Sequence, residues 1–78
     1  KMNELIELLK NLRPDIDFES EKHLIDDGLL TSFDIIEISS EIQDEFDIDL
    51  TPLDMVPENF QSADAMYEMI KRLSDEDE

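Results

Sequence analysis

The sequence predicts a small all-α protein, namely a four-helix bundle of three main helices, one short helix and a long loop between the first two. Three observations support this prediction. Apolar residues recur at helical spacing in three separate stretches, no stretch alternates as a β-strand does, and two of the stretches begin behind a serine or threonine. The 78 residues suffice for one domain with a single small core, which we expect to span residues 1–74 ahead of an acidic tail at 75–78.

The first helix is predicted in the stretch that Pro14 ends. Its apolar residues, which alternate with charged ones at helical spacing, are Met2, Leu5, Ile6, Leu8, Leu9 and Leu12. Residues 13–31 keep no sustained period, so we expect a long loop there, and a loop of this length in a small domain is usually functional. The apolar residues expected to anchor this loop to the core are Phe18, Leu24, Ile25, Leu29 and Leu30.

The second helix is predicted in residues 32–46, and it contains neither lysine nor arginine. Its apolar stripe consists of Ile35, Ile38, Ile42 and Phe46. The opposite side is expected to carry an acidic stripe of Asp34, Glu37, Glu41 and either Asp44 or Glu45.

The remaining elements are a short helix and a last main helix. A turn of helix is expected around residues 57–60, between proline-containing segments. Ser62 is then expected to cap the last helix. The residues of this helix that are expected to face the core are Ala65, Met66, Met69, Ile70 and Leu73.

The start of the second helix offers two hydroxyls, and the sequence indicates which of them caps it. Thr31 and Ser32 could each accept a hydrogen bond from a free amide of the first turn. Thr31 has Asp34 three residues on, a short-armed capping box, whereas Ser32 has Ile35, which cannot reach back. We therefore predict that Thr31 is the N-cap and that Ser32 begins the helix with its hydroxyl pointing outward. Helix N-termini favour phosphate groups, so this position suits one.

Gly28, the only glycine, precedes this helix start by a few residues. A residue that tolerates positive φ would let the loop turn sharply into the helix. An alternative interpretation remains open at this point: the helix start is an ordinary cap, and Gly28 is an ordinary turn residue.

The charge of the chain excludes several classes of function. Asp and Glu number 23 against six Lys and Arg, which gives a formal net charge of −17. Phosphate backbones and anionic membrane surfaces would be repelled, so neither nucleic acid nor membrane is an expected partner. No apolar run is long enough for a membrane span or a signal peptide, and the cytoplasm is the expected compartment. The chain has no cysteine, so disulfide bonds cannot supplement its core. We also expect the protein to be a monomer.

Two site chemistries can be weighed against the sequence. The stretch D-I-D-F-E-S-E-K-H-L-I-D has alternating acids, but Ser20 and Asp26 stand where an EF-hand loop needs glycine and glutamate. Hydrolysis by Ser32 with His23, the only histidine, lacks the G-x-S-x-G elbow and a deep pocket. We therefore predict no catalytic residues, no metal site and no enzyme activity.

The stretch D-D-G-L-L-T-S-F-D-I-I-E-I, residues 26–38, resembles the attachment-site motif of acyl carrier proteins. In that family an acidic residue, a glycine and a hydrophobic pair precede Asp-Ser-Leu at the start of the second helix. The resemblance continues through E-I-Q-D-E-F-D-I-D-L and P-E-N-F-Q-S-A-D-A-M, so that it covers most of the chain. Thr31 replaces the family's usual Asp and Phe33 replaces its usual Leu.

The resemblance implies that Ser32 carries 4′-phosphopantetheine, transferred from coenzyme A by a Mg²⁺-dependent phosphopantetheinyl transferase. The thiol of that arm would hold acyl or aminoacyl groups as thioesters for partner enzymes. Fatty acid, polyketide and related pathways use such carriers, and an alternative is a D-alanyl or aminoacyl carrier that works with an adenylating ligase. A further alternative is an unmodified acidic helical interaction module.

Partner enzymes with basic docking patches are expected to contact the helix that begins at Ser32. The residues predicted to make these contacts are Asp34, Ile36, Glu37, Ser40 and Glu41. An acyl chain could be sheltered between core residues of the bundle, for which the candidates are Ile35, Ile38, Ile42, Met66, Met69 and Ile70.

Overall fold

A computed structural model describes the backbone of residues 1–76 and the side chains of residues 1–74. Its elements are α1 (Met2–Leu12), α2 (Ser32–Phe46), the 3-10 turns η1 (Pro52–Asp54) and η2 (Pro57–Asn59), and α3 (Ala63–Glu76). No strand occurs within residues 1–76, so the all-α prediction is confirmed. None of the helices described has the length and apolarity that crossing a membrane requires.

The turn of helix expected around residues 57–60 is the 3-10 turn η2, and a second 3-10 turn, η1, precedes it. Each turn begins with a proline, whose fixed φ suits the first position of a helix. Val56, the residue before Pro57, has the extended backbone that a residue before proline favours, so η1 does not continue into η2. The segment between α2 and α3 therefore consists of short turns and not of a fourth α-helix.

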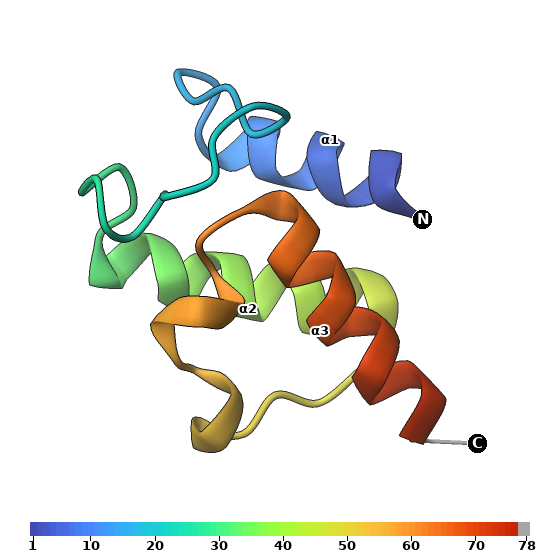
Figure 1. The fold of residues 1–78 in the computed structure, drawn as a ribbon. Coiled ribbons are helices and arrows are strands. Elements are labelled where there is room, and N and C mark those ends of the chain that lie inside the picture. Colours follow the sequence, from blue (N-terminus) through green and yellow to red (C-terminus); the bar gives the residue numbers. More distant parts are fainter. Residues whose placement is uncertain (77–78) are drawn as a thin grey trace.

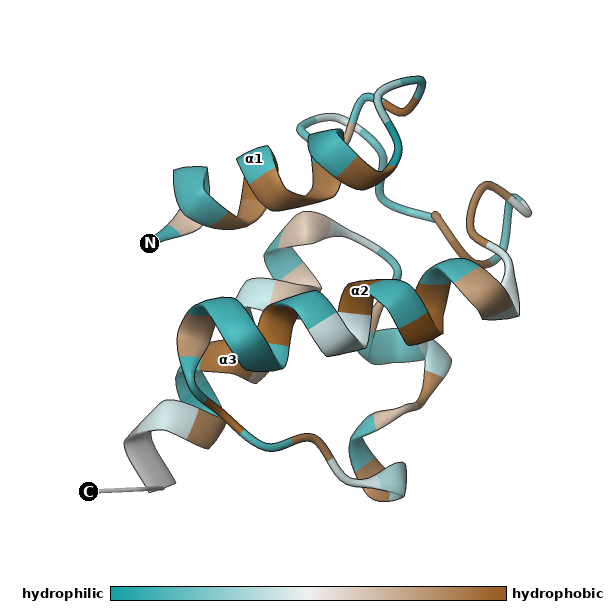
Figure 2. Ribbon diagram, turned by 180° about the vertical axis from the view of Figure 1, so that it is seen from behind, coloured by the Kyte–Doolittle hydropathy of each residue, from teal (hydrophilic) through white to brown (hydrophobic). Residues whose placement is uncertain are grey.

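The three helices pack around one core. α1 and α2 run in opposite directions, α3 crosses them obliquely, and the loop after α1 arches over the start of α2 (Figure 1). The hydrophobic face of α1 is directed toward the other two helices (Figure 2). The fully buried side chains with the largest volumes are Phe18, Phe60, Leu5, Leu9, Leu24, Ile38, Ile42, Met66 and Met69.

The long loop is anchored as the sequence predicts, with one addition. Phe18, Leu24 and Leu30 are buried in the core, while Ile25 and Leu29 are partly buried against it. Ile16 is also buried, although its isolated position between two aspartates gives no periodic signal.

The last helix begins as expected, because the Ala65 amide donates a hydrogen bond to the Ser62 hydroxyl at 3.0 Å. Its backbone continues through Glu76 and therefore includes the first two residues of the expected tail. The rest of that tail, residues 77–78, lies outside the described residues.

Candidate functional site

Thr31 caps α2 in the manner that the capping-box pattern indicates. Its backbone is extended, and its hydroxyl oxygen accepts a hydrogen bond from the Asp34 amide at 3.1 Å. In return, Asp34 Oδ2 accepts hydrogen bonds from the Thr31 amide at 2.9 Å and from the Thr31 hydroxyl at 3.1 Å. Ser32 is the first helical residue, and the cap does not use its hydroxyl. The reciprocal box therefore leaves the Ser32 side chain free beside the positive end of the helix.

Asp34 does not belong to the exposed acidic stripe in which it was expected. Its side chain is only 12% exposed, and Arg13 Nη1 lies 2.7 Å from its Oδ2. Hydrogen bonds from the Thr31 backbone lower the pKa of the Asp34 carboxyl, the Thr31 hydroxyl and Arg13 add to this, and burial opposes it. The short Asp34 side chain reaches back to the cap and to Arg13, so its expected place on the exposed acidic stripe is wrong.

Gly28 gives the loop the turn that leads into α2. Its φ is +73°, and a Cβ built there would meet nothing within 4 Å, so its role is conformational and not one of close packing. The turn is closed by the Leu24 carbonyl, which accepts from the amides of Leu29 at 3.0 Å and Leu30 at 3.1 Å. Leu30 is buried one residue before the cap. The loop therefore arrives at Thr31 from a fixed direction.

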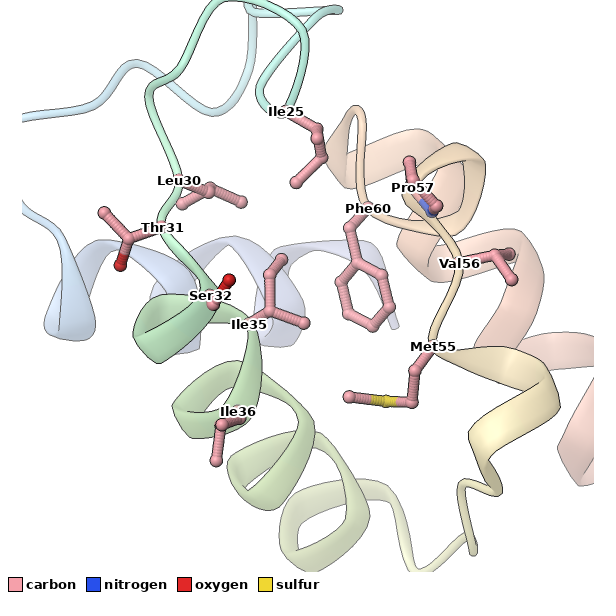
Figure 3. Close-up of a pocket in the computed structure, with 10 residues that line it drawn as sticks. All are labelled: Ile25, Leu30, Thr31, Ser32, Ile35, Ile36, Met55, Val56, Pro57 and Phe60. Carbon is pink, nitrogen blue, oxygen red and sulfur yellow. The ribbon is translucent and has the colours of Figure 1, made fainter.

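Ser32 lies at the rim of an apolar cavity of about 350 Å³. In Figure 3, Leu30, Thr31 and Ser32 form one side of the cavity and Met55, Val56 and Pro57 form the other. The remaining lining residues are Ile25, Ile35, Ile36 and Phe60. A group attached to the Ser32 hydroxyl would have a mostly apolar surface directly beside it.

The cavity lies in a different place from the one that the core pattern suggested. Of the six core residues considered for sheltering a chain, Ile35 alone lines it, and the others are buried in the interior. Its far wall comes from the segment with the two 3-10 turns. Sequence reasoning missed this wall, because proline-rich segments carry no periodicity from which a side-chain direction can be predicted.

The outer side of α2 carries exposed apolar and acidic residues together. Phe33 and Ile36 are 67% and 62% exposed. Glu37, Ser40 and Glu41, three of the predicted contact residues, are also exposed. A surface that is apolar in part and negative in part suits a partner with basic and apolar side chains.

A second groove, of about 460 Å³, separates α2 from η1. Ile36 and Met55 line both this groove and the cavity at Ser32. Leu53, on η1, is 87% exposed. Neither Leu53 nor Met55 was predicted as a site residue. The signal in the sequence is that these two apolar residues lie close together between Pro52 and Pro57.

The described residues contain no group of three or more His, Cys, Asp or Glu side chains that could hold a metal ion. His23 is exposed and is not among the residues that line the cavity. The arrangement at Ser32 can therefore present a hydroxyl, a helix terminus and an apolar cavity to a partner molecule.

Comparison with known proteins identifies a relative. Over 54 residues the chain is 39% identical to aminoacyl carrier protein 2 of Bradyrhizobium diazoefficiens. The aligned region covers 69% of this chain and 60% of that protein. This similarity supports an acyl or aminoacyl carrier protein family for this chain. No protein-family model matches the chain. No solved structure matches it either.

The similarity to a carrier protein agrees with the prediction that this chain is not an enzyme. The relative is named as a carrier and not as an enzyme. Carrier proteins are substrates of the enzymes that load and unload them, so the chemistry needs an accessible attachment point and not an active site. The chain spans 60% of the relative's length, so the similarity describes a carrier-like region and not that whole protein.

Proposed function

We propose that this chain is a carrier protein whose Ser32 bears 4′-phosphopantetheine. The observation that carries the proposal is that the two hydroxyls at the start of α2 have different roles. Thr31 caps the helix, and the cap does not use the exposed Ser32 hydroxyl. The amides of the first turn favour a phosphate at this place. The apolar cavity beside Ser32 supports the fit of an attached arm.

In this proposal a phosphopantetheinyl transferase supplies the base and Mg²⁺, and coenzyme A is the donor. The Ser32 oxygen forms a phosphodiester with the pantetheine-bound phosphorus, 3′,5′-ADP leaves, and the serine proton passes to the transferase. The thiol of the bound arm supplies thioester chemistry. The chain's own residues fix the position of the hydroxyl and provide an apolar surface beside it.

Two kinds of cargo remain candidates, and each has its own support. The name of the relative favours an aminoacyl group that is delivered by an adenylating ligase. The apolar lining of the cavity favours an acyl chain of fatty acid, polyketide or related biosynthesis. Loading assays with ATP and an aminoacyl-adenylating ligase, run beside assays with an acyl donor and its transferase, would distinguish them. Because coenzyme A and ATP are cytoplasmic metabolites, we propose the cytoplasm as the site of action.

Partner enzymes are proposed to dock on the outer side of α2. We call Phe33, Ile36, Glu37, Ser40 and Glu41 the docking surface; all five are exposed. The negative charge of the chain would guide basic patches of partners to it, and the apolar side chains would supply contact area. Encounters of this kind are salt-dependent, which suits a carrier that must leave each partner after every transfer.

Intact mass spectrometry tests the proposal. The protein is incubated with coenzyme A, Mg²⁺ and a broad-specificity phosphopantetheinyl transferase, and the expected result is a gain of one phosphopantetheine. Ser32→Ala should gain nothing, while Ser20→Ala, a change at an exposed loop serine, should be modified as the wild type is. No gain in a folded wild-type protein, with both this transferase and a dedicated one, would favour the unmodified interaction module.

A further inference from the structure

Arg13 joins the end of α1 to both sides of the Ser32 position. It is the C-cap residue of α1, and its side chain is 28% exposed. Its Nη1 donates to the Leu29 carbonyl at 3.1 Å and to Asp34 Oδ2 at 2.7 Å. Leu29 and Asp34 flank Ser32 in the sequence, three residues before it and two after it. One guanidinium nitrogen therefore holds the incoming loop and the first turn of α2 together.

The remaining nitrogens of the same guanidinium face outward. Nε and Nη2 donate to the two carboxylate oxygens of Asp15 at 3.0 and 2.8 Å, and the Asp15 side chain is 63% exposed. Arginine is suited to this arrangement because it stays charged and presents several donors in a fixed planar fork. A lysine ammonium at this position could reach one of the acceptors but would not reproduce the fork.

The Arg13–Asp34 contact differs from the other ion pairs in the described part of the chain. Both of its side chains are less than a third exposed, whereas in the pairs Lys10–Glu19, Lys22–Asp64 and Lys71–Glu68 both partners are about half exposed or more. Exposed pairs contribute little and are screened by salt. A partly buried, hydrogen-bonded pair restricts its partners more strongly, because solvent competes less with it.

We propose that Arg13 is a positioning residue for Ser32. Its contacts to Leu29 and Asp34 keep the first turn of α2 formed, so that the serine hydroxyl is held in one place before a modifying enzyme binds. This inference rests on the proposed function of Ser32. Without Arg13 the capping box would remain, but the enzyme would have to order the helix start on binding.

Kinetics of modification and amide exchange together test this role. In Arg13→Gln, KM for the protein as substrate of the transferase is expected to rise about tenfold with kcat nearly unchanged, since the lost contact orders the substrate before chemistry. Hydrogen exchange of the Asp34 amide, which donates to the Thr31 hydroxyl, should accelerate by about tenfold as well. Arg13→Lys should recover part of both effects.

Two control variants separate positioning from a general loss of stability. Asp15→Asn removes the exposed carboxylate from the same guanidinium and should leave KM and Asp34 exchange unchanged. Ile70→Val weakens the core on α3, away from the residues that line the cavity, and should also leave KM unchanged. Stability measured in urea verifies that every variant stays folded under the assay conditions.

The outcomes distinguish this inference from the proposed function. A modified wild type together with an unchanged KM and unchanged Asp34 exchange in Arg13→Gln would overturn the role of Arg13 alone. An equal rise of KM in Ile70→Val would likewise overturn it, because the effect would then follow stability and not position. A wild type that no transferase modifies would overturn the carrier function, and with it the role of Arg13 in modification.

Discussion

The molecule contains the pattern Thr-x-x-Asp twice, and the two copies have different structures. At Thr31 and Asp34 the box is reciprocal and begins a helix of 15 residues. At Thr51 and Asp54 the carboxylate accepts from the threonine amide at 2.9 Å and from its hydroxyl at 3.2 Å, almost as in the first copy. The Asp54 amide, however, donates to the Thr51 carbonyl, and the turn ends after three residues.

Pro52, at the first helical position of the second copy, suits a helix start, so the cause of the difference lies outside the four residues of each pattern. The first copy is followed by apolar residues at helical spacing and is held by Arg13 from another element. The second is followed closely by Pro57. A capping box stabilises the first turn of a helix. Tertiary contacts and the residues that follow decide whether the helix continues beyond that turn. The first copy therefore forms a fixed side of the cavity, and the second leads into its opposite wall.

The largest contrast is expected from removing the carboxylate of each copy. Asp34→Ala should lower the free energy of unfolding by about 2 kcal/mol, because it breaks the cap and leaves the partly buried Arg13 nitrogen without its acceptor. Asp54→Ala should lower the free energy of unfolding by less than about 0.5 kcal/mol, because the Asp54 carboxylate stabilises only a 3-10 turn of three residues. Urea unfolding of both variants measures the contrast, and equal losses would refute the distinction between the two copies.

Acid should remove part of the same stabilisation. The pKa of Asp34 is lowered in the folded protein, so its carboxylate contributes stability that is fully present above the ordinary pKa and is lost as the pH falls through the folded value. Below about pH 4, the unfolding free energy of the wild type should therefore fall more steeply than that of Asp34→Asn. The other carboxylates titrate in both the wild type and Asp34→Asn. Parallel curves of unfolding free energy against pH for these two proteins would therefore argue against a contribution from Asp34.

The threonine hydroxyls should differ by a smaller amount. Thr31→Ala is expected to cost about 1 kcal/mol, because the Asp34 amide loses its acceptor. The Thr51 hydroxyl donates to Asp54 but is not the acceptor of its amide, so Thr51→Ala should stay within about 0.5 kcal/mol of the wild type. Thermal or urea unfolding would show the difference, and a larger loss for Thr51→Ala would reverse the proposed ranking.

The smallest contrast is expected from salt. A formal net charge of −17 should produce self-repulsion, so added salt should raise Tm by a few degrees, and Mg²⁺ or Ca²⁺ should raise it further. The rise should be similar in Asp34→Ala and Asp54→Ala, because the repulsion comes from the whole surface. A Tm that does not change across a low-to-moderate salt series would contradict this view of the charge.

The local features of the site could be predicted from the sequence because they depend on neighbours in the chain. The choice of Thr31 over Ser32 as the cap follows from what stands three residues later, and the positive φ of Gly28 follows from its place before an anchored helix start. The three helices follow from periodicity. The attachment role of Ser32 came from family resemblance and stays a proposal.

The features that sequence analysis missed depend on contacts between distant residues. Asp34 was expected both in the cap and on an exposed stripe, and one short side chain cannot do both; Arg13, 21 residues away, completes its inward orientation. The exposed Leu53 and the cavity wall around Met55 lie in a segment where prolines interrupt every period. Their side-chain directions follow from how that segment packs on the helices and not from its own pattern.

Localisation of the added group by peptide-level mass spectrometry is the most direct test of a carrier built around Ser32. The protein would be modified with coenzyme A and a transferase, digested, and fragmented to assign the modified residue. The expected result is one phosphopantetheine on Ser32, and on none of the serines further along α2 at Ser39 and Ser40. Attachment at another residue, or a folded protein that takes up no group from any transferase, would contradict the proposed role of this helix start.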